Sequence, residues 1–146
     1  MKAKTIVLLH GASSNLREFE HSLTPVLQDN YRVLAFDRPG YGFSERDKSR
    51  NNISWASPEV QADVLHEALV KLDVKQPILV GHSWSGALVM AYALKYSQHA
   101  RAVVLLGGAT HAWQGGVAWH ITLAQAPVIG SLFTRTLFFP AARAAR

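Results

Sequence analysis

The segment around Ser83 constrains the fold more than any other part of the chain. An apolar run, Pro77-Ile78-Leu79-Val80, leads directly into Gly81-His82-Ser83-Trp84-Ser85-Gly86, and a helix-forming stretch follows. A short apolar run of this kind is typical of a buried strand. The small residues on either side of Ser83 let the backbone turn sharply without side-chain clashes. The pattern predicts a strand, a tight turn and a helix, with the Ser83 hydroxyl exposed at the carboxyl end of the strand.

Short apolar runs alternate with helical patterns along most of the chain. The pattern predicts strands at residues 5–9, 32–36, 76–80 and 102–106, with apolar residues at helical spacing over 16–27 and helices over 57–72 and 84–96. Nearly continuous apolar strands separated by helices favour a parallel sheet with helices on both faces. Ligands bind at the carboxyl ends of the strands in such a sheet. His10-Gly11, Asp37 and Ser83 all follow predicted strands.

Composition excludes several classes of function. The 146 residues are 49% hydrophobic and 17% charged, which is typical of a globular domain. The net charge is +5, but the 15 Lys and Arg residues are spread along the chain, which argues against nucleic-acid binding. The absence of cysteine excludes disulfides and thiolate metal ligands and is compatible with a cytoplasmic location. No His, Asp or Glu cluster has the spacing of a metal site, so we expect no metal.

A long uncharged stretch raises the question of membrane contact. Residues 107–133 contain no Asp, Glu, Lys or Arg, a length compatible with a membrane-spanning helix. Histidine, glutamine, threonine, glycine and proline residues interrupt it, however. We therefore interpret this stretch as an apolar helical lid over a pocket and expect no stable membrane span.

Three motifs occur in order along the chain. His10-Gly11-Ala12-Ser13-Ser14 follows the first predicted strand, the segment from Asp37 to Ser44 follows the second, and the Ser83 turn follows the third. Together they resemble the α/β-hydrolase superfamily, especially its capped serine esterases, over about residues 5–110. The resemblance implies a partial α/β-hydrolase core over residues 1–110. Residues 111–146 are expected to be the truncated start of a helical cap.

The resemblance also implies roles for individual residues. Ser83 matches the catalytic nucleophile, and the backbone N–H groups of Trp84 and Ala12 match the two donors of an oxyanion hole. Asp37 is interpreted as an anchor for the turn that follows it, because it precedes the nucleophile in the chain. The residues that support these motifs are His10, Gly11, Gly81, His82 and Gly86.

Two departures from the family pattern matter. The usual motif is GxSxG, but position 85 is serine and Gly86 comes one place later; serine is small enough for the turn to survive. The acid and the histidine of the triad follow the nucleophile in this family and would fall beyond Arg146. We therefore expect this chain to be the N-terminal part of a longer enzyme, without the base that Ser83 needs.

The resemblance implies a serine hydrolase that cleaves an ester or similar acyl bond of a small, apolar substrate without a cofactor. A serine at position 83 argues against the dehalogenase and epoxide hydrolase branches, which use aspartate there. Hydrolysis of a C–C bond, aminopeptidase chemistry and perhydrolysis remain open. A different possibility is an inactive fragment or interaction remnant. An exposed sheet edge would then favour self-association.

Overall fold

The computed structural model describes residues 4–47, 52–111, 122–123, 126, 129–134 and 136. The chain divides into two compact units, Met1–Ala112 and Trp113–Arg146. In the second unit, the helix that the structure describes is α6 (Ile129–Phe133). Most of the predicted cap, with Trp113 and Trp119, lies outside the described residues, so the cap remains a prediction.

Four parallel strands form the centre of the first unit. They are β1 (Thr5–Leu9), β2 (Arg32–Phe36), β3 (Ile78–His82) and β4 (Ala102–Leu106), and their order across the sheet is β2-β1-β3-β4. In the register of the sheet, Leu9 lies beside Phe36 and Gly81. The strands therefore end at the same edge, and the segments that begin with His10, Asp37 and Ser83 leave the sheet there.

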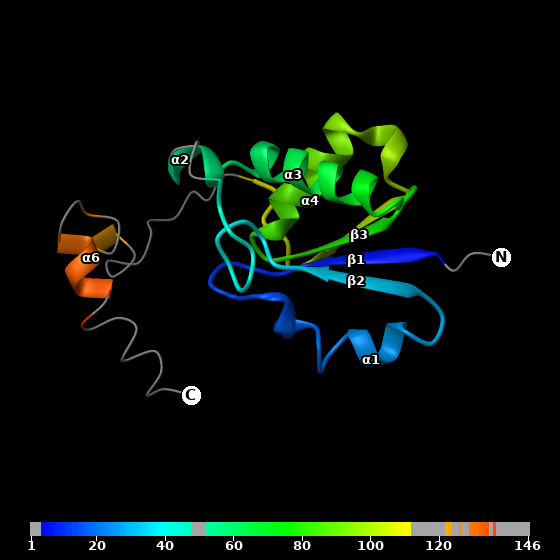
Figure 1. The fold of residues 1–146 in the computed structure, drawn as a ribbon, viewed down its shortest axis with the longest axis horizontal. Coiled ribbons are helices and arrows are strands. Elements are labelled where there is room, and N and C mark those ends of the chain that lie inside the picture. The colour runs from blue at the N-terminus through cyan, green and yellow to red at the C-terminus, as the bar shows by residue number, and fades with distance from the viewer. Residues whose placement is uncertain are drawn as a thin grey trace. The chain divides into compact units, whose positions relative to one another are not determined.

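Helices cover both faces of the sheet, which confirms the predicted parallel α/β architecture. One face packs against α3 (Pro58–Lys71) and α4 (Ser85–Lys95), while α1 (Thr24–Leu27) lies on the opposite side (Figure 1). The alternation of side chains along each strand produces two cores. On the first face, Val7, Leu9 and Leu79 join Leu65, Leu69, Leu88, Val89 and Tyr92; on the second, Ile6, Leu8 and Val80 join Phe19.

The segment over residues 16–27 differs from the helical pattern predicted for it. It forms a short 3-10 helix, η1 (Leu16–Glu18), and then the single turn of α1. Pro25 occupies the first turn of α1, a position where its missing N–H is not needed. Continuing a helix from η1 through Pro25 would lose a backbone hydrogen bond and create a clash. The segment breaks into two, and Phe19 between them enters the second core.

Most of the other predicted boundaries hold, with local exceptions. The strand predicted at 76–80 begins at Ile78, because Gln76 has a φ of 49° and cannot continue an extended strand. A short helix that the sequence pattern did not predict, α2 (Asn52–Trp55), precedes α3. The start of α3 is confirmed: the Ser57 side chain accepts a hydrogen bond from the Val60 N–H. A second 3-10 helix, η2 (Ser97–His99), precedes β4.

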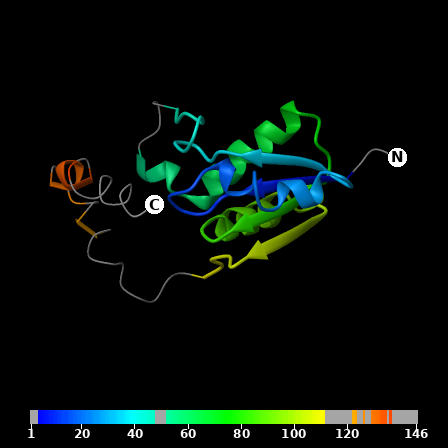
Figure 2. The same cartoon turned by 90° about the horizontal axis from the view of Figure 1, so that it is seen from below.

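The outer strand β4 is less covered than the central strands. Viewed from below in Figure 2, β4 forms one side of the sheet. Val104 is 41% exposed and Leu105 40% exposed, whereas the side chains of the central β1 are mostly buried. This is the exposed apolar edge that the sequence predicted, and self-association through it remains a prediction. Within the described part of the chain, no helix combines the length and apolar character needed to cross a bilayer.

Candidate active site

The sharp turn predicted at Ser83 is present, and its backbone is strained. Ser83 lies between the end of β3 and the start of α4 with a φ of 50°. This left-handed conformation is unfavourable for a residue with a side chain, so surrounding contacts must hold it. The Ser83 N–H donates to the Leu106 carbonyl at 3.0 Å, and the Ser83 carbonyl accepts from the Ala109 N–H at 2.9 Å. The end of β4 therefore fixes the turn from both sides.

Two glycines allow this turn to pack closely. A Cβ atom at Gly81 would lie 2.4 Å from the Ser85 carbonyl oxygen, and one at Gly86 would lie 2.6 Å from the Gly108 Cα. Both contacts are with backbone, which cannot move aside as a flexible side chain can. The roles given to Gly81 and Gly86 in the turn thus have a steric reason.

Ser85 occupies the position where the usual motif has glycine. Its side chain is fully buried, and its hydroxyl donates a hydrogen bond to the His10 carbonyl at 2.6 Å. The turn survives the substitution because serine fits, as the sequence suggested. The hydrogen bond was not foreseen, because it joins residues that are 75 positions apart. It links the end of β1 to the start of α4.

The loop after β1 passes directly beside Ser83. A Cβ atom at Gly11 would lie 3.1 Å from the Ser83 Cβ and 3.1 Å from the His82 Nδ1. The backbone N–H groups of Ala12 and Trp84 have no hydrogen-bond acceptor among the described residues. Both residues line the same cavity of about 120 Å³. Two unengaged amides beside a strained serine are the arrangement that an oxyanion hole requires.

His10 is a structural residue in this arrangement. The side chain is fully buried; Nε2 accepts from the Arg38 N–H at 3.0 Å, and Nδ1 lies 2.8 Å from the Gly11 carbonyl. Since Nε2 must be bare to accept, we assign the ring as neutral with its proton on Nδ1. Burial lowers the pKa of His10 from its ordinary value. The ring ties the loop after β1 to the loop after β2 and has no free nitrogen for catalysis.

Glu18 is a contact of the motif residues that sequence reasoning missed. One carboxylate oxygen accepts from the Gly11 N–H at 3.4 Å, and the other lies 2.5 Å from the His82 Nδ1. The second contact lacks hydrogen-bond geometry, so its attraction is electrostatic when the ring is protonated. Glu18 thus contacts both Gly11, which precedes the candidate oxyanion donor Ala12, and His82, which precedes Ser83.

Asp37 anchors a turn, as the sequence predicted. Its Oδ1 accepts from the Leu16 N–H at 2.8 Å, and its Oδ2 accepts from the Phe43 N–H at 2.9 Å. A Cβ atom at Gly42 would lie 2.0 Å from Oδ2, so the close approach of the backbone depends on glycine there. Both oxygens of Asp37 are engaged by backbone groups, and the carboxylate has no role as a triad acid.

Arg38 was treated as a turn residue in the sequence but proves to be part of the cavity beside Ser83. Only 3% of it is exposed. The guanidinium lies over the rings of Trp84 and Tyr41, at 4.3 and 4.4 Å from their centres, distances typical of cation–π contacts. Nη2 donates to the Gly11 carbonyl at 3.0 Å and Nη1 to the Gln61 Oε1 at 3.4 Å. Burial lowers the Arg38 pKa.

The site brings together a serine and two amide donors but not a complete triad. Among the described residues, no histidine nitrogen forms a hydrogen bond with the Ser83 hydroxyl. No group of three or more His, Cys, Asp or Glu side chains in the described ranges could hold a metal ion. The arrangement can position a carbonyl group and stabilise an oxyanion, while the proton of Ser83 needs a base from elsewhere.

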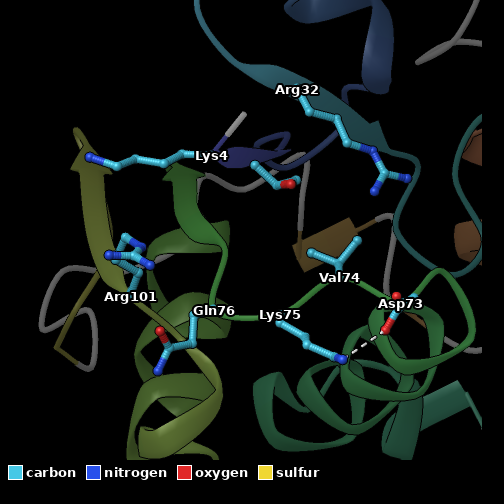
Figure 3. Close-up of a pocket in the computed structure, with 8 residues that line it drawn as sticks. Lys4, Arg32, Asp73, Val74, Lys75, Gln76 and Arg101 are labelled. Carbon is cyan, nitrogen blue, oxygen red and sulfur yellow. Dashed lines mark ion pairs between the residues drawn. The ribbon is translucent and has the colours of Figure 1, made fainter. Parts of the chain in front are cut away.

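A second, larger cavity lies at the opposite end of the strands. It has a volume of about 420 Å³ and is lined by Lys4, Thr5, Arg32, Asp73, Val74, Lys75, Gln76 and Arg101 (Figure 3). Lys75 and Asp73 form an ion pair at 3.4 Å in this cavity. It holds no nucleophile and lies at the amino ends of the strands. The smaller cavity is lined by Ala12 and Trp84, which carry the two candidate amide donors, and not by Ser83 itself, which directly precedes Trp84 in the chain. We take it as the candidate active site.

Comparison with known proteins places the chain in a family. Residues 4–145 match a family model described as alpha/beta hydrolase fold. The chain is 32% identical over 111 residues to a 2-hydroxy-6-oxononadienedioate/2-hydroxy-6-oxononatrienedioate hydrolase from Cupriavidus pinatubonensis, covering 74% of this chain. It is 30% identical over 110 residues to the enzyme of the same name from Escherichia coli K12, covering 73% of this chain.

The aligned region is only part of these relatives. The chain spans 37% of the length of each of the two relatives. Among solved structures, Cfl2 from Burkholderia cenocepacia superimposes with a TM-score of 0.76 at 20% identity, covering 91% of this chain and 47% of that protein. At this level of identity the likeness concerns the fold alone.

Proposed function

The chain belongs to the α/β-hydrolase fold family, and from this premise we propose that it carries the nucleophile and oxyanion hole of a serine hydrolase. By lineage it is a hydrolase. The observation that carries the proposal is the strained backbone of Ser83, whose φ of 50° presents the hydroxyl at the carboxyl edge of the sheet. The adjacent, unengaged amides of Ala12 and Trp84 support it.

In the proposed mechanism, the Ser83 Oγ attacks the carbonyl carbon of the substrate. The negative charge that develops on the carbonyl oxygen is stabilised by the N–H groups of Ala12 and Trp84. Removing one such donor typically slows an acyl transfer by about 100- to 1,000-fold. When the intermediate collapses, the bond between the carbonyl carbon and the leaving group breaks, and the leaving group takes up the proton removed from Ser83. Water then hydrolyses the acyl–Ser83 ester and releases the acid. A histidine oriented by an acid accepts the proton of Ser83, and we propose that both come from the portion equivalent to the unaligned part of the relatives.

The substrate is a small carbonyl compound, and two kinds of scissile bond fit the site. An ester is the first candidate, because a serine with two amide donors is sufficient for acyl transfer once a base is present. A C–C bond next to a carbonyl is the second, since the two relatives with 30% and 32% identity are named as hydrolases of 2-hydroxy-6-oxo dioates. Both reactions begin with the same carbonyl activation.

The remaining parts of the proposal concern organisation and location. Residues 1–110 form the part of the hydrolase core present in this chain, and residues 111–146 are the start of a cap. No cofactor takes part in the proposed reaction. We place the protein in the cytoplasm, with which the absence of cysteine is compatible.

Covalent labelling of the nucleophile tests the proposal. In a protein that includes the portion supplying the histidine, a fluorophosphonate should modify Ser83, and Ser83→Ala should abolish the labelling. Ser22→Ala is the matched control, because Ser22 is exposed and outside the cavity; its labelling should equal that of the unsubstituted protein. If the folded protein is not labelled, or if labelling survives Ser83→Ala, the proposal is wrong and the chain is better explained as an inactive remnant.

The bond type requires an activity measurement on the same protein. Release of nitrophenol from p-nitrophenyl butyrate reports ester hydrolysis, and loss of the dienol absorbance of a 2-hydroxy-6-oxo-dienoate reports C–C cleavage. A protein that hydrolyses only the dienoate would exclude the ester as its substrate. One that hydrolyses only the ester would exclude the second candidate.

A further inference from the structure

Arg38 presents a charge that the described residues do not neutralise. The side chain is 97% buried, since 3% of it is exposed, and it forms no ion pair within the described part of the chain. Removing a cation from water is costly, so buried arginines are generally paired with a carboxylate or another anion. The two aromatic rings and two neutral oxygens around Arg38 offset only part of that cost.

One donor of the guanidinium is unused. Nη1 and Nη2 donate to neutral oxygens, whereas Nε is buried and has no hydrogen-bond partner among the described residues. An unpaired buried N–H is unfavourable unless water or a ligand satisfies it. Arg38 lines the 120 Å³ cavity that Ala12 and Trp84 also line. The unsatisfied donor therefore belongs to a residue in contact with the candidate active-site cavity.

The carboxylates of Asp37 and Glu18 do not form an ion pair with Arg38, because both have other partners. Asp37, next to Arg38 in the chain, accepts hydrogen bonds on both oxygens from backbone N–H groups. Glu18 contacts the Gly11 N–H and the His82 ring. Among the described residues that line the cavity, none is acidic, and Tyr41, Trp55 and Trp84 are aromatic. The cavity is therefore partly aromatic, with the Arg38 guanidinium in its lining.

We propose that this cavity binds a carboxylate group of the substrate, with Arg38 as its anchor. The inference rests on the proposed function and narrows its substrate class to a carbonyl compound that also carries a carboxylate. The guanidinium offers the directional donors that suit a carboxylate. Trp84 and Tyr41 provide apolar walls for the carbon chain between the two groups. Anchoring the carboxylate there would present the carbonyl to Ser83, beside the Ala12 and Trp84 amides. This replaces the wholly apolar substrate expected from the sequence.

The first experiment measures binding without chemistry. Hexanoate and hexanamide have the same chain length and differ in charge, and each is titrated into the protein by calorimetry at constant ionic strength. Loss of hydrogen bonds to a charged group corresponds to roughly ten- to hundredfold in affinity. Hexanoate should therefore bind at least about tenfold more tightly than hexanamide. Equal affinities would overturn the proposal, as would displacement of hexanoate by an equal concentration of chloride.

Substitution of the anchor assigns the binding to this cavity. Arg38→Gln should remove the preference for hexanoate, and Arg32→Gln is the matched control because Arg32 is exposed and lines the other cavity. Arg38→Lys keeps the charge without the planar fork and should retain only part of the preference. Far-ultraviolet circular dichroism establishes that each variant is folded. If a folded Arg38 variant keeps the full preference, the anchor is not Arg38. If neither Arg38 variant folds, the hexanoate preference and the labelling test below, both on the unsubstituted protein, decide the proposal.

A labelling experiment separates this inference from the proposed function. Saturating hexanoate should slow fluorophosphonate labelling of Ser83 by at least about tenfold if the site is nine-tenths occupied, while the same concentration of hexanamide should slow it less. Normal labelling in the presence of bound hexanoate would overturn the assignment of the cavity as a substrate subsite. If Ser83 is never labelled, the proposed function fails, and the subsite proposal, which rests on it, falls with it. The calorimetry then shows whether Arg38 still holds an anion.

Discussion

The buried hydroxyl of Ser85 allows a quantitative test of how the active-site turn is held together. It donates to the His10 carbonyl at 2.6 Å, and no other hydrogen bond to that carbonyl is found among the described residues. Ser85→Ala would leave a buried carbonyl without a donor. The desolvation cost of such an unsatisfied group is about 1–3 kcal/mol. We expect Ser85→Ala to lower the free energy of unfolding by about 2 kcal/mol.

Urea denaturation followed by circular dichroism measures this change. For a chain of this size, a loss of about 2 kcal/mol corresponds to a decrease in Tm of roughly 4–8 °C, which thermal melts would detect. Ser85→Gly, which restores the residue of the usual motif, should be at least as destabilising, because it loses the same hydrogen bond and adds backbone entropy.

Ser22→Ala is the matched control for this prediction. Its hydroxyl also donates to a backbone carbonyl, that of Glu18 at 2.8 Å, but this hydrogen bond is exposed to water. Water replaces the lost donor there, so the change should be within about 0.5 kcal/mol. Equal effects of Ser85→Ala and Ser22→Ala would refute the reasoning that burial of the His10 carbonyl, rather than the hydrogen bond alone, sets the cost.

Three further predictions concern the same region. Gly86→Ala should destabilise the protein by at least about 2 kcal/mol in urea denaturation, since its Cβ would meet backbone at 2.6 Å. Gly107→Asn is the control: a Cβ there meets nothing within 4 Å, and asparagine tolerates the φ of 54°, so the loss of stability should be less than about 1 kcal/mol. Asp37→Ala should lower the free energy of unfolding by about 2–4 kcal/mol, because two backbone N–H groups lose their acceptor. Asp29→Ala, at an exposed position, is the control. An equal decrease in that variant would show that the effect is not specific to the turn. Burial lowers the pKa of His10, so on acidification this histidine takes up its proton in the unfolded state before it does so in the folded state. The free energy of unfolding should therefore fall as the pH decreases below 6.5, by at most about 1.4 kcal/mol per pH unit from this group. An NMR titration in which the His10 ring of the folded protein is protonated above pH 6.5 would contradict this.

Much of the fold could be predicted because its signals are local. The bounds of β1, β2 and β4 coincide with the predicted ranges 5–9, 32–36 and 102–106. Apolar runs of this length bury themselves on both faces of a parallel sheet wherever they occur. The two exceptions, the broken helical segment at 16–27 and the later start of β3, arise where single residues, Pro25 and Gln76, adopt backbone conformations that hydrophobic spacing does not encode.

The candidate site also has features that could be predicted from the sequence and features that could not. Ser83 and the glycines around it follow from a contiguous motif whose residue types already define a sharp turn. The contacts of Ser85, Glu18 and Arg38 could not be predicted, because each depends on loops that meet only after the sheet has formed. Ser85 reaches a carbonyl 75 positions away, and Arg38 reaches one 27 positions away.

The sequence by itself determined the kind of fold, the position of the candidate nucleophile and the edge of the sheet where the candidate site lies. These properties depend on the spacing of residues along the chain, and parallel pairing brings the strand ends together without further information. Only the tertiary structure decided which polar groups are satisfied and which are left for a ligand. The sequence places Arg38 in a turn. It becomes a candidate anchor because folding buries its guanidinium beside Trp84, while the carboxylates of Asp37 and Glu18 contact other partners.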